Sequence, residues 1–151
     1  MLKNKIYKIL NKIMGQNISI NRINFENIQK LIKNKNTNTN DYLLINTLAN
    51  DNQECLILNT ISANNEVEII NNYLKSNKKN VNIIIYGMNC SDISIVKKYN
   101  QLYKLGFKNL YIYIGGLFEW LLLQDIYGDE EFPTTNKILD ILKYKGKLLN
   151  M

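Results

Sequence analysis

The sequence contains no histidine, two cysteines and a single arginine among its 151 residues. The absence of histidine excludes His-based catalytic triads, histidine proton relays and most zinc sites. Cys55 and Cys90 lie too far apart in the sequence to form a metal-binding motif. We therefore expect no metal site and no cofactor. Nothing resembles a cleavable signal peptide, so we also expect an intracellular, reducing compartment in which both thiols are free.

The scarcity of arginine also weighs against a nucleic-acid partner. The formal net charge of +6 comes almost wholly from lysine, whereas nucleic-acid recognition usually relies on arginine and a clustered basic face. Here the lysines are dispersed, and Arg22 is the only arginine. The abundant Asn, Ile, Lys and Tyr share AT-rich codons, which suggests an AT-rich genome such as that of a large DNA virus or a protist. The apolar runs are too short to span a bilayer.

Strand-like and helical segments alternate along the chain, a pattern typical of parallel α/β domains. The predicted strands are residues 42–47, 55–61, 81–86 and 109–114. The predicted helices are residues 2–14, 25–32, 64–74, 91–105, 117–127 and 136–144. Expected N-caps are Asn24, Asn64 or Asn65, and Thr135, and Gly106 is expected to end the fourth helix. Ligands of such sheets bind beyond the carboxyl ends of the strands, where the loop after Tyr86 lies.

The segment "NIIIYG", followed by a loop, a helix and "LGFKNLYIYIGGLFEW", resembles the second half of a rhodanese-like domain. "INFENIQKLI" and "DYLLINTL" resemble its first half, so the similarity covers roughly Ile23 to Tyr144. It implies a three-layer α/β/α rhodanese-like fold with a mainly parallel central sheet. The corresponding domain assignment is a basic amphipathic extension over residues 1–22 and the rhodanese-like domain over residues 23–151.

The resemblance also implies a functional position directly after the strand that ends at Tyr86. Rhodanese-like enzymes carry a nucleophilic cysteine there, and backbone N–H groups of the following loop and helix surround its sulfur. In this chain Gly87 occupies that position. The loop continues through Met88, Asn89, Cys90 and Ser91, and Asp92 falls near the place where the family often has a basic residue.

Further departures lie in the first half of the resemblance. The family's Asp and Arg after the "LI" strand correspond to Asn46 and Leu48. These replacements, together with Gly87, predict a catalytically inactive rhodanese-like domain that acts as a binding or adaptor module.

Cys90 supports the alternative, an active sulfurtransferase that carries a persulfide on this displaced cysteine. No cation lies between Gly87 and Asp92, and Asp92 disfavours a thiolate nearby. The phosphatases of this fold need an arginine after the cysteine, and "CSDISIV" has none. We expect Cys55, which aligns with a structural turn, to be a buried or loop thiol.

The N-terminal segment suggests a route to membranes. "MGQNIS" matches the myristoylation pattern, with Gly15 as the acceptor if Met14 is an initiator methionine. The basic amphipathic helix before it has the character of a membrane-surface helix or of one that packs on the domain. A membrane-associated or virion-associated adaptor is therefore a third hypothesis.

A protein partner is expected to bind the region from Gly116 to Thr135. This stretch is longer than the resemblance requires, and Leu121 to Leu123 give more apolar surface than one helix face usually buries. The alternative is a helix buried all round. Trp120 is expected to lie in the core.

Overall fold

The computed structural model describes residues 19–34 and 42–151 and contains one parallel sheet of four strands. The strands are β1 (Asn21–Ile23), β2 (Tyr42–Asn46), β3 (Asn82–Tyr86) and β4 (Leu110–Tyr113), and their order in the sheet is β1-β4-β3-β2. Strand β3 lies in the interior of the sheet, between β2 and β4. Its continuous apolar sequence suits this place, because a central strand of a parallel sheet is covered on both faces.

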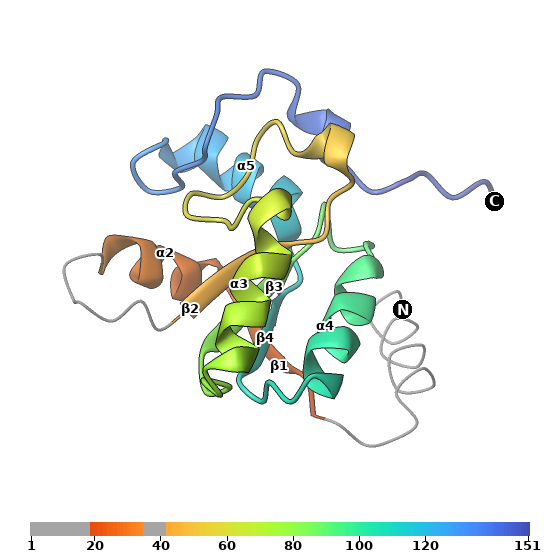
Figure 1. The fold of residues 1–151 in the computed structure, drawn as a ribbon. Coiled ribbons are helices and arrows are strands. Elements are labelled where there is room, and N and C mark those ends of the chain that lie inside the picture. The colour runs from red at the N-terminus through yellow and green to blue at the C-terminus, as the bar shows by residue number, and fades with distance from the viewer. Residues whose placement is uncertain (1–18, 35–41) are drawn as a thin grey trace.

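Helices cover both faces of the sheet, which gives the three-layer arrangement expected from the sequence (Figure 1). On one face, α3 (Ala63–Lys75) and α4 (Ser94–Lys104) pack in a core that includes Ile83 and Ile85 of β3. On the other face, α2 (Phe25–Lys33) and α5 (Gly116–Tyr127) pack in a second core that includes Ile84 and Tyr86. The alternation of β3 side chains between the two cores follows from the two-residue repeat of a strand.

Most of these helices and strands were predicted correctly from the sequence, including the start of α2. The Asn24 side chain accepts hydrogen bonds from the N–H groups of Glu26 and Asn27, as a helix N-cap should. Gly106 follows α4 with a φ of +99°, a conformation that favours glycine. The prediction of Asn64 or Asn65 as the cap of α3 was wrong. That helix begins after Ser62, because the Ile61 N–H bonds Leu44 O at 2.8 Å and brings the chain straight from the sheet into the helix.

The strand predicted over residues 55–61 was wrong. This segment forms only isolated bridges, from Thr60 to Leu44 and from Ile57 to Thr134. Side chains take the place of a strand neighbour, since the Leu56 N–H donates to Thr135 Oγ1 and the Ile57 N–H donates to Tyr86 Oη. Conversely, β1 was missed: it is three residues long, and two of them are polar and exposed.

The helix predicted over residues 136–144 with Thr135 as its cap was also wrong. Only a short 3-10 turn, η2 (Ile141–Tyr144), forms there. The Thr135 N–H donates to Leu56 O at 2.8 Å, and Thr134 Oγ1 donates to Asn136 O. These bonds hold the residues before η2 in an extended path against the 55–57 segment, so a helix cannot begin at Thr135.

Gly15 and the amphipathic segment 2–14 lie outside the described residues. Within residues 19–34 and 42–151, no helix combines the length and apolar character needed to cross a membrane.

Candidate functional site

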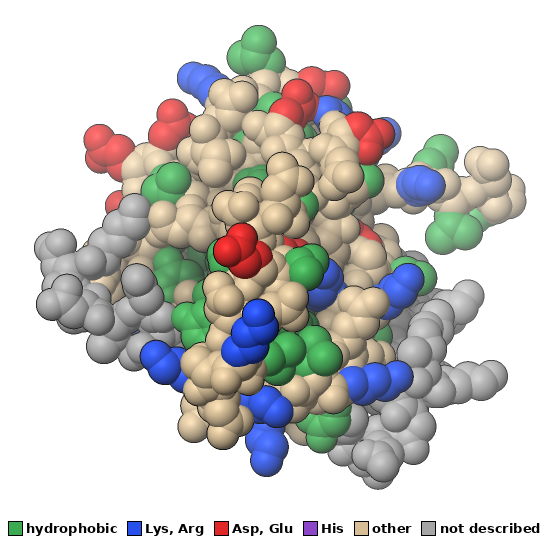
Figure 2. Space-filling model, viewed as in Figure 1, with side chains coloured by type: hydrophobic (Ala, Val, Ile, Leu, Met, Phe, Trp, Pro, Cys, Tyr) green, Lys and Arg blue, Asp and Glu red, His purple; other side chains and the backbone are tan. Residues whose placement is uncertain are grey.

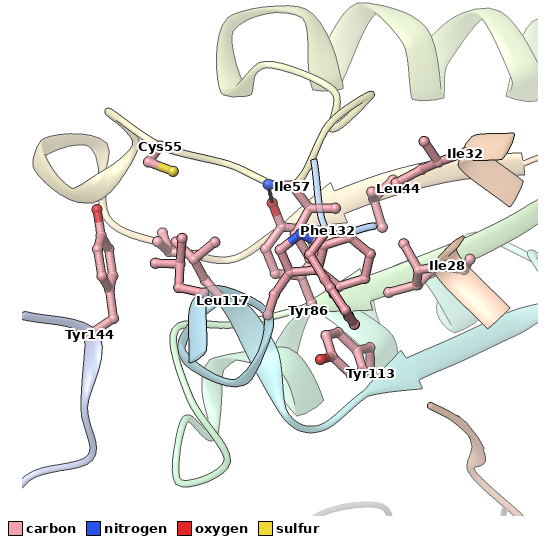
Figure 3. Close-up of a cluster of buried hydrophobic side chains, with 14 residues drawn as sticks. Ile28, Ile32, Leu44, Cys55, Ile57, Tyr86, Tyr113, Leu117, Phe132 and Tyr144 are labelled. Carbon is pink, nitrogen blue, oxygen red and sulfur yellow. Dashed lines mark hydrogen bonds between the residues drawn. The ribbon is translucent and has the colours of Figure 1, made fainter. Parts of the chain in front are cut away.

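The candidate site is the loop from Gly87 to Ile93, which connects β3 to α4 at the carboxyl edge of the sheet. Tyr86, the last residue of β3, anchors the base of this loop. Its ring is fully buried in the core on the α2/α5 face (Figure 3). Its hydroxyl accepts from the Ile57 N–H at 3.2 Å and lies 2.8 Å from Thr60 Oγ1. Burial raises the pKa of Tyr86 well above its usual value, so the phenol stays neutral.

The Asp92 carboxylate occupies the space beside the start of the loop. Asp92 Oδ2 accepts from the Met88 N–H at 2.9 Å, and Oδ1 accepts from the Ser94 N–H at 2.9 Å and from Ser94 Oγ at 2.6 Å. Ser94 Oγ also lies 2.7 Å from Thr47 Oγ1, which follows β2. Amides of the loop and of the start of α4 therefore converge on a negative group, and this group belongs to the chain itself.

Gly87 leaves no room for a side chain. A Cβ atom built on Gly87 would lie 2.6 Å from Asp92 Oδ2, 2.9 Å from Asp92 Cγ and 3.0 Å from Ile95 Cγ2. Carbon atoms do not approach carboxylate oxygens this closely without displacement. The glycine and the folded-back carboxylate thus fit each other, and a cysteine at position 87 is incompatible with Asp92 as it stands.

The start of α5 closes the loop from the other side. The Leu117 and Phe118 N–H groups donate to Gly87 O and Met88 O, each at 2.9 Å. Gly116 has a φ of +67°, and a Cβ atom there would lie 2.6 Å from Gly87 O. Gly116, which follows β4 and Gly115, therefore lets the backbone pass close to the β3–α4 loop.

Asn89 joins the loop to the C-terminal part of the chain. It is buried, its Nδ2 donates to Tyr144 O at 3.0 Å, and its Oδ1 accepts from the Ser91 N–H at 3.0 Å. The loop is therefore held at Asn89, at Asp92 and at its contacts with α5.

Cys90 is exposed in this loop, as are Ser91 and Ile93. Ser91, Asp92 and Ile93 separate it from the first residue of α4. Asp92, rather than Cys90, receives the Met88 and Ser94 amides. The position of Cys90 thus differs from that of a sulfur held among converging backbone donors.

Cys55 lies in the core. It is fully buried, and its Sγ donates to Asn136 O at 3.1 Å. Burial raises the pKa of this thiol. The expectation of a buried thiol is confirmed, and a buried thiol with a raised pKa is a poor nucleophile.

A cleft of about 1150 Å³ opens over the loop, and we call it the loop cleft. Three segments and Asn52 line it; the segments are residues 47–49 after β2, residues 88–94 without Cys90, and the C-terminal residues 142–149 without Tyr144. Met88, Asn89, Ser91 and Asp92 of the candidate site are thereby brought to one surface, while Cys90 is not among the lining residues of the described chain.

Asn46 and Leu48 lie at the neighbouring carboxyl end of β2 and are both buried. The Leu48 N–H donates to Asn46 Oδ1 at 3.0 Å. Neither the carboxylate nor the guanidinium implied by the resemblance is present at these positions. Asn46 and Leu48 are both uncharged, so burying them leaves no unpaired charge in the protein interior.

The role of Asp92 was missed from the sequence. Asp92 was predicted to be a repulsive charge near a thiolate, whereas the structure shows that it accepts from one amide of the loop and one at the start of α4. The available signal was "SDIS", in which Asp92 precedes Ser94 by two residues, a spacing typical of an aspartate that accepts from a nearby backbone N–H.

Comparisons with solved structures identify the fold. The chain is similar to the Rhodanese-like domain of the Alr3790 protein from Anabaena sp., with a TM-score of 0.54, 16% identity, and coverage of 88% of this chain and 92% of that one. It is similar to the Saccharomyces cerevisiae single-domain sulfurtransferase RDL2, with a TM-score of 0.51, 16% identity, and coverage of 74% and 97%. It is also similar to Ygr203w, a yeast protein tyrosine phosphatase of the Rhodanese family, with a TM-score of 0.52, 17% identity, and coverage of 82% and 98%.

These likenesses, together with the parallel sheet and its two helical layers, establish a rhodanese-like fold. No family model matches the chain, and no curated protein matches it in sequence.

Proposed function

We propose that this chain is a rhodanese-like domain that does not transfer sulfur and acts as a binding module. The observation that carries the proposal is the Asp92 carboxylate, which accepts from the Met88 and Ser94 amides and fills the space next to Gly87. In an active domain of this fold, such donors are expected to stabilise a persulfide or an anionic substrate. Here a carboxylate satisfies them, and it also repels any anion that approaches.

Sulfur transfer is the alternative, since one of the structural neighbours is a sulfurtransferase. The reaction needs a thiolate that attacks the outer sulfur of thiosulfate, forms an S–S bond and releases sulfite. Cyanide then removes the outer sulfur as thiocyanate and restores the thiolate. Cys90 is the exposed thiol of the described chain, so this alternative must use Cys90. Phosphatase chemistry is not supported, because no arginine lies between Gly87 and Ser94.

The test is thiosulfate:cyanide turnover in the unmodified chain and in three variants. Cys90→Ser removes the exposed thiol. In that background, Gly87→Cys is compared with Gly87→Cys/Asp92→Ala, in which the colliding carboxylate is also absent. We expect no turnover above the uncatalysed rate for the unmodified chain, for Cys90→Ser or for Gly87→Cys. The variant with both changes should gain a persulfide at position 87.

Circular dichroism and thermal unfolding establish whether each variant is folded. Turnover by the unmodified chain that disappears in Cys90→Ser would establish the alternative. A persulfide in the Gly87→Cys variant with Asp92 intact would show that Asp92 does not block this position.

The remaining proposal concerns where a partner binds. The region from Gly116 to Thr135 was expected to carry that surface, and α5 buries Leu117, Trp120 and Leu121 but leaves Ile126 and Tyr127 exposed. The helix is therefore not buried all round. The surface around the exposed Ile126 and Tyr127 is one candidate for the partner-binding site, and the loop cleft is the other.

A further inference from the structure

We propose that the loop cleft docks an extended segment of a partner protein that carries both carboxylates and apolar side chains. This inference rests on the proposed binding function and assigns the partner's chemistry. The cleft exceeds the typical volume of small-molecule sites, which is on the order of 300–1000 Å³. Its residues come from three separate segments of the chain, and an extended stretch of polypeptide can contact all three.

The charge of the cleft favours an acidic partner. Lys143, Lys145 and Lys147 line its C-terminal side and are exposed. Lys143 forms an ion pair with Glu54, whereas Lys145 and Lys147 form no ion pair within the described part of the chain. The acidic residue in the lining is Asp92, and its two oxygens already accept from two backbone amides and Ser94 Oγ. Lys145 and Lys147 thus have no counter-ion among the described residues that line the cleft.

The cleft lining also contains exposed apolar side chains, so a matching partner must carry apolar side chains as well as carboxylates. Ile93 is 61% exposed, Leu142 is 61% exposed and Leu148 is 89% exposed, and all three line the cleft. In Figure 2, the C-terminal segment projects on the right of the molecule and shows both lysine and hydrophobic side chains. Apolar side chains placed together around a concave surface mark a site of association.

A lipid surface shares this chemistry, because anionic headgroups with acyl chains also match lysine and leucine. The concave shape favours the peptide: the cleft lies between the β3–α4 loop and the C-terminal segment, and Asn89 joins these two walls through its bond to Tyr144 O. A planar bilayer reaches the rim of such a cleft but not its floor. The loop beneath is fixed by its own hydrogen bonds, so the floor is preformed for a partner.

The experiment is selection of phage-displayed random peptides of about a dozen residues, long enough to follow the cleft in an extended conformation, against the full chain. We expect the selected peptides to combine Asp or Glu with Leu, Ile, Phe or Trp. The affinity of a synthesised consensus peptide is then measured by fluorescence polarisation. Lys145→Glu/Lys147→Glu should weaken binding by about tenfold or more, and Ile93→Asp should weaken it similarly, since each change opposes one part of the match.

The matched control is Lys104→Glu/Lys108→Glu, which makes the same charge change at exposed lysines beyond the loop cleft. It should alter the affinity by less than about twofold, and high salt should weaken binding of the unmodified chain. Ile126→Asp tests the α5 surface. Selection of peptides without acidic residues, or equal losses in the control, would overturn the inference.

Two further outcomes also contradict the inference. Loss of peptide binding in Ile126→Asp alone would place the partner on α5. Flotation of the unmodified chain with phosphatidylserine vesicles, lost in Lys145→Glu/Lys147→Glu, in the absence of any peptide binder would assign the cleft to a membrane. Neither outcome bears on sulfur transfer, so failure of this inference is distinguishable from failure of the proposed function.

Discussion

Among single residues, two buried tyrosine hydroxyl groups contribute differently to the stability of the fold. Tyr86 Oη is bonded to Ile57 N and Thr60 Oγ1. Tyr144 is equally buried, but its hydroxyl has no hydrogen-bond partner among the described residues. A satisfied buried hydroxyl stabilises the fold, whereas an unsatisfied one costs free energy that folding must offset elsewhere.

The same substitution should therefore have opposite effects at the two tyrosines. Tyr86→Phe leaves the Ile57 N–H without its acceptor and should lower the free energy of unfolding by about 1–3 kcal/mol. Tyr144→Phe removes an unpaired hydroxyl and should leave the free energy of unfolding unchanged or raise it slightly. Urea denaturation of both variants measures the difference. Equal destabilisation by both would contradict this account of the buried network.

At the scale of elements, the sequence predicted those parts of the fold that local patterns determine. The β-branched run of β3, the N-cap at Asn24 and the glycine after α4 all act within a few residues of their position. The errors lie where distant contacts decide. Residues 55–61 and 135–144 are held by bonds between each other and to Tyr86, and such partners cannot be read from local spacing.

In the candidate site, too, some features could be predicted from the local sequence and others could not. The sequence revealed the glycine in the position after β3 and the absence of nearby cations. It did not reveal that Asp92 folds back onto Met88, because this depends on the exact course of a loop. The close approach of α5 to the loop depends on Gly116, and this contact gives the clearest prediction at this scale.

Gly116→Ala should destabilise the domain by about 2 kcal/mol or more, because a side chain is strained at a φ of +67° and its Cβ atom would lie 2.6 Å from Gly87 O. Gly146→Ala is the control. A Cβ atom there has its nearest contact at 3.4 Å, with Ser91 Oγ, so this change should stay within about 0.5 kcal/mol. Thermal unfolding followed by calorimetry compares the two, and similar stabilities for the two variants would contradict the close approach.

At the scale of the whole molecule, the absence of histidine and the burial of phenols determine how stability depends on pH. No histidine titrates near neutrality. Burial raises the pKa of the Cys55 thiol and of the Tyr86 phenol, so each group holds its proton more tightly in the folded chain than in the unfolded chain. Their contribution to stability is fully present below the unfolded pKa values and is lost as the pH rises through the range between the unfolded and folded values.

The free energy of unfolding should therefore change little between about pH 6 and pH 8 and fall steadily above about pH 9, where unfolded cysteine and then unfolded tyrosine begin to lose protons. Urea denaturation at a series of pH values measures this profile. The control is Tyr86→Phe, in which the alkaline decline should be shallower. A maximum of stability above pH 10 would contradict the inferred pKa directions.

We propose that the whole domain combines the rhodanese-like fold with a carboxylate, that of Asp92, which accepts from the amides expected to hold a transferable sulfur. The most direct test is the intact mass of the unmodified chain after incubation with thiosulfate and removal of the reagent. We predict the mass of the untreated chain, with both thiols recovered by alkylation. An added sulfur atom that maps to Cys90 and is passed on to cyanide would contradict the claim.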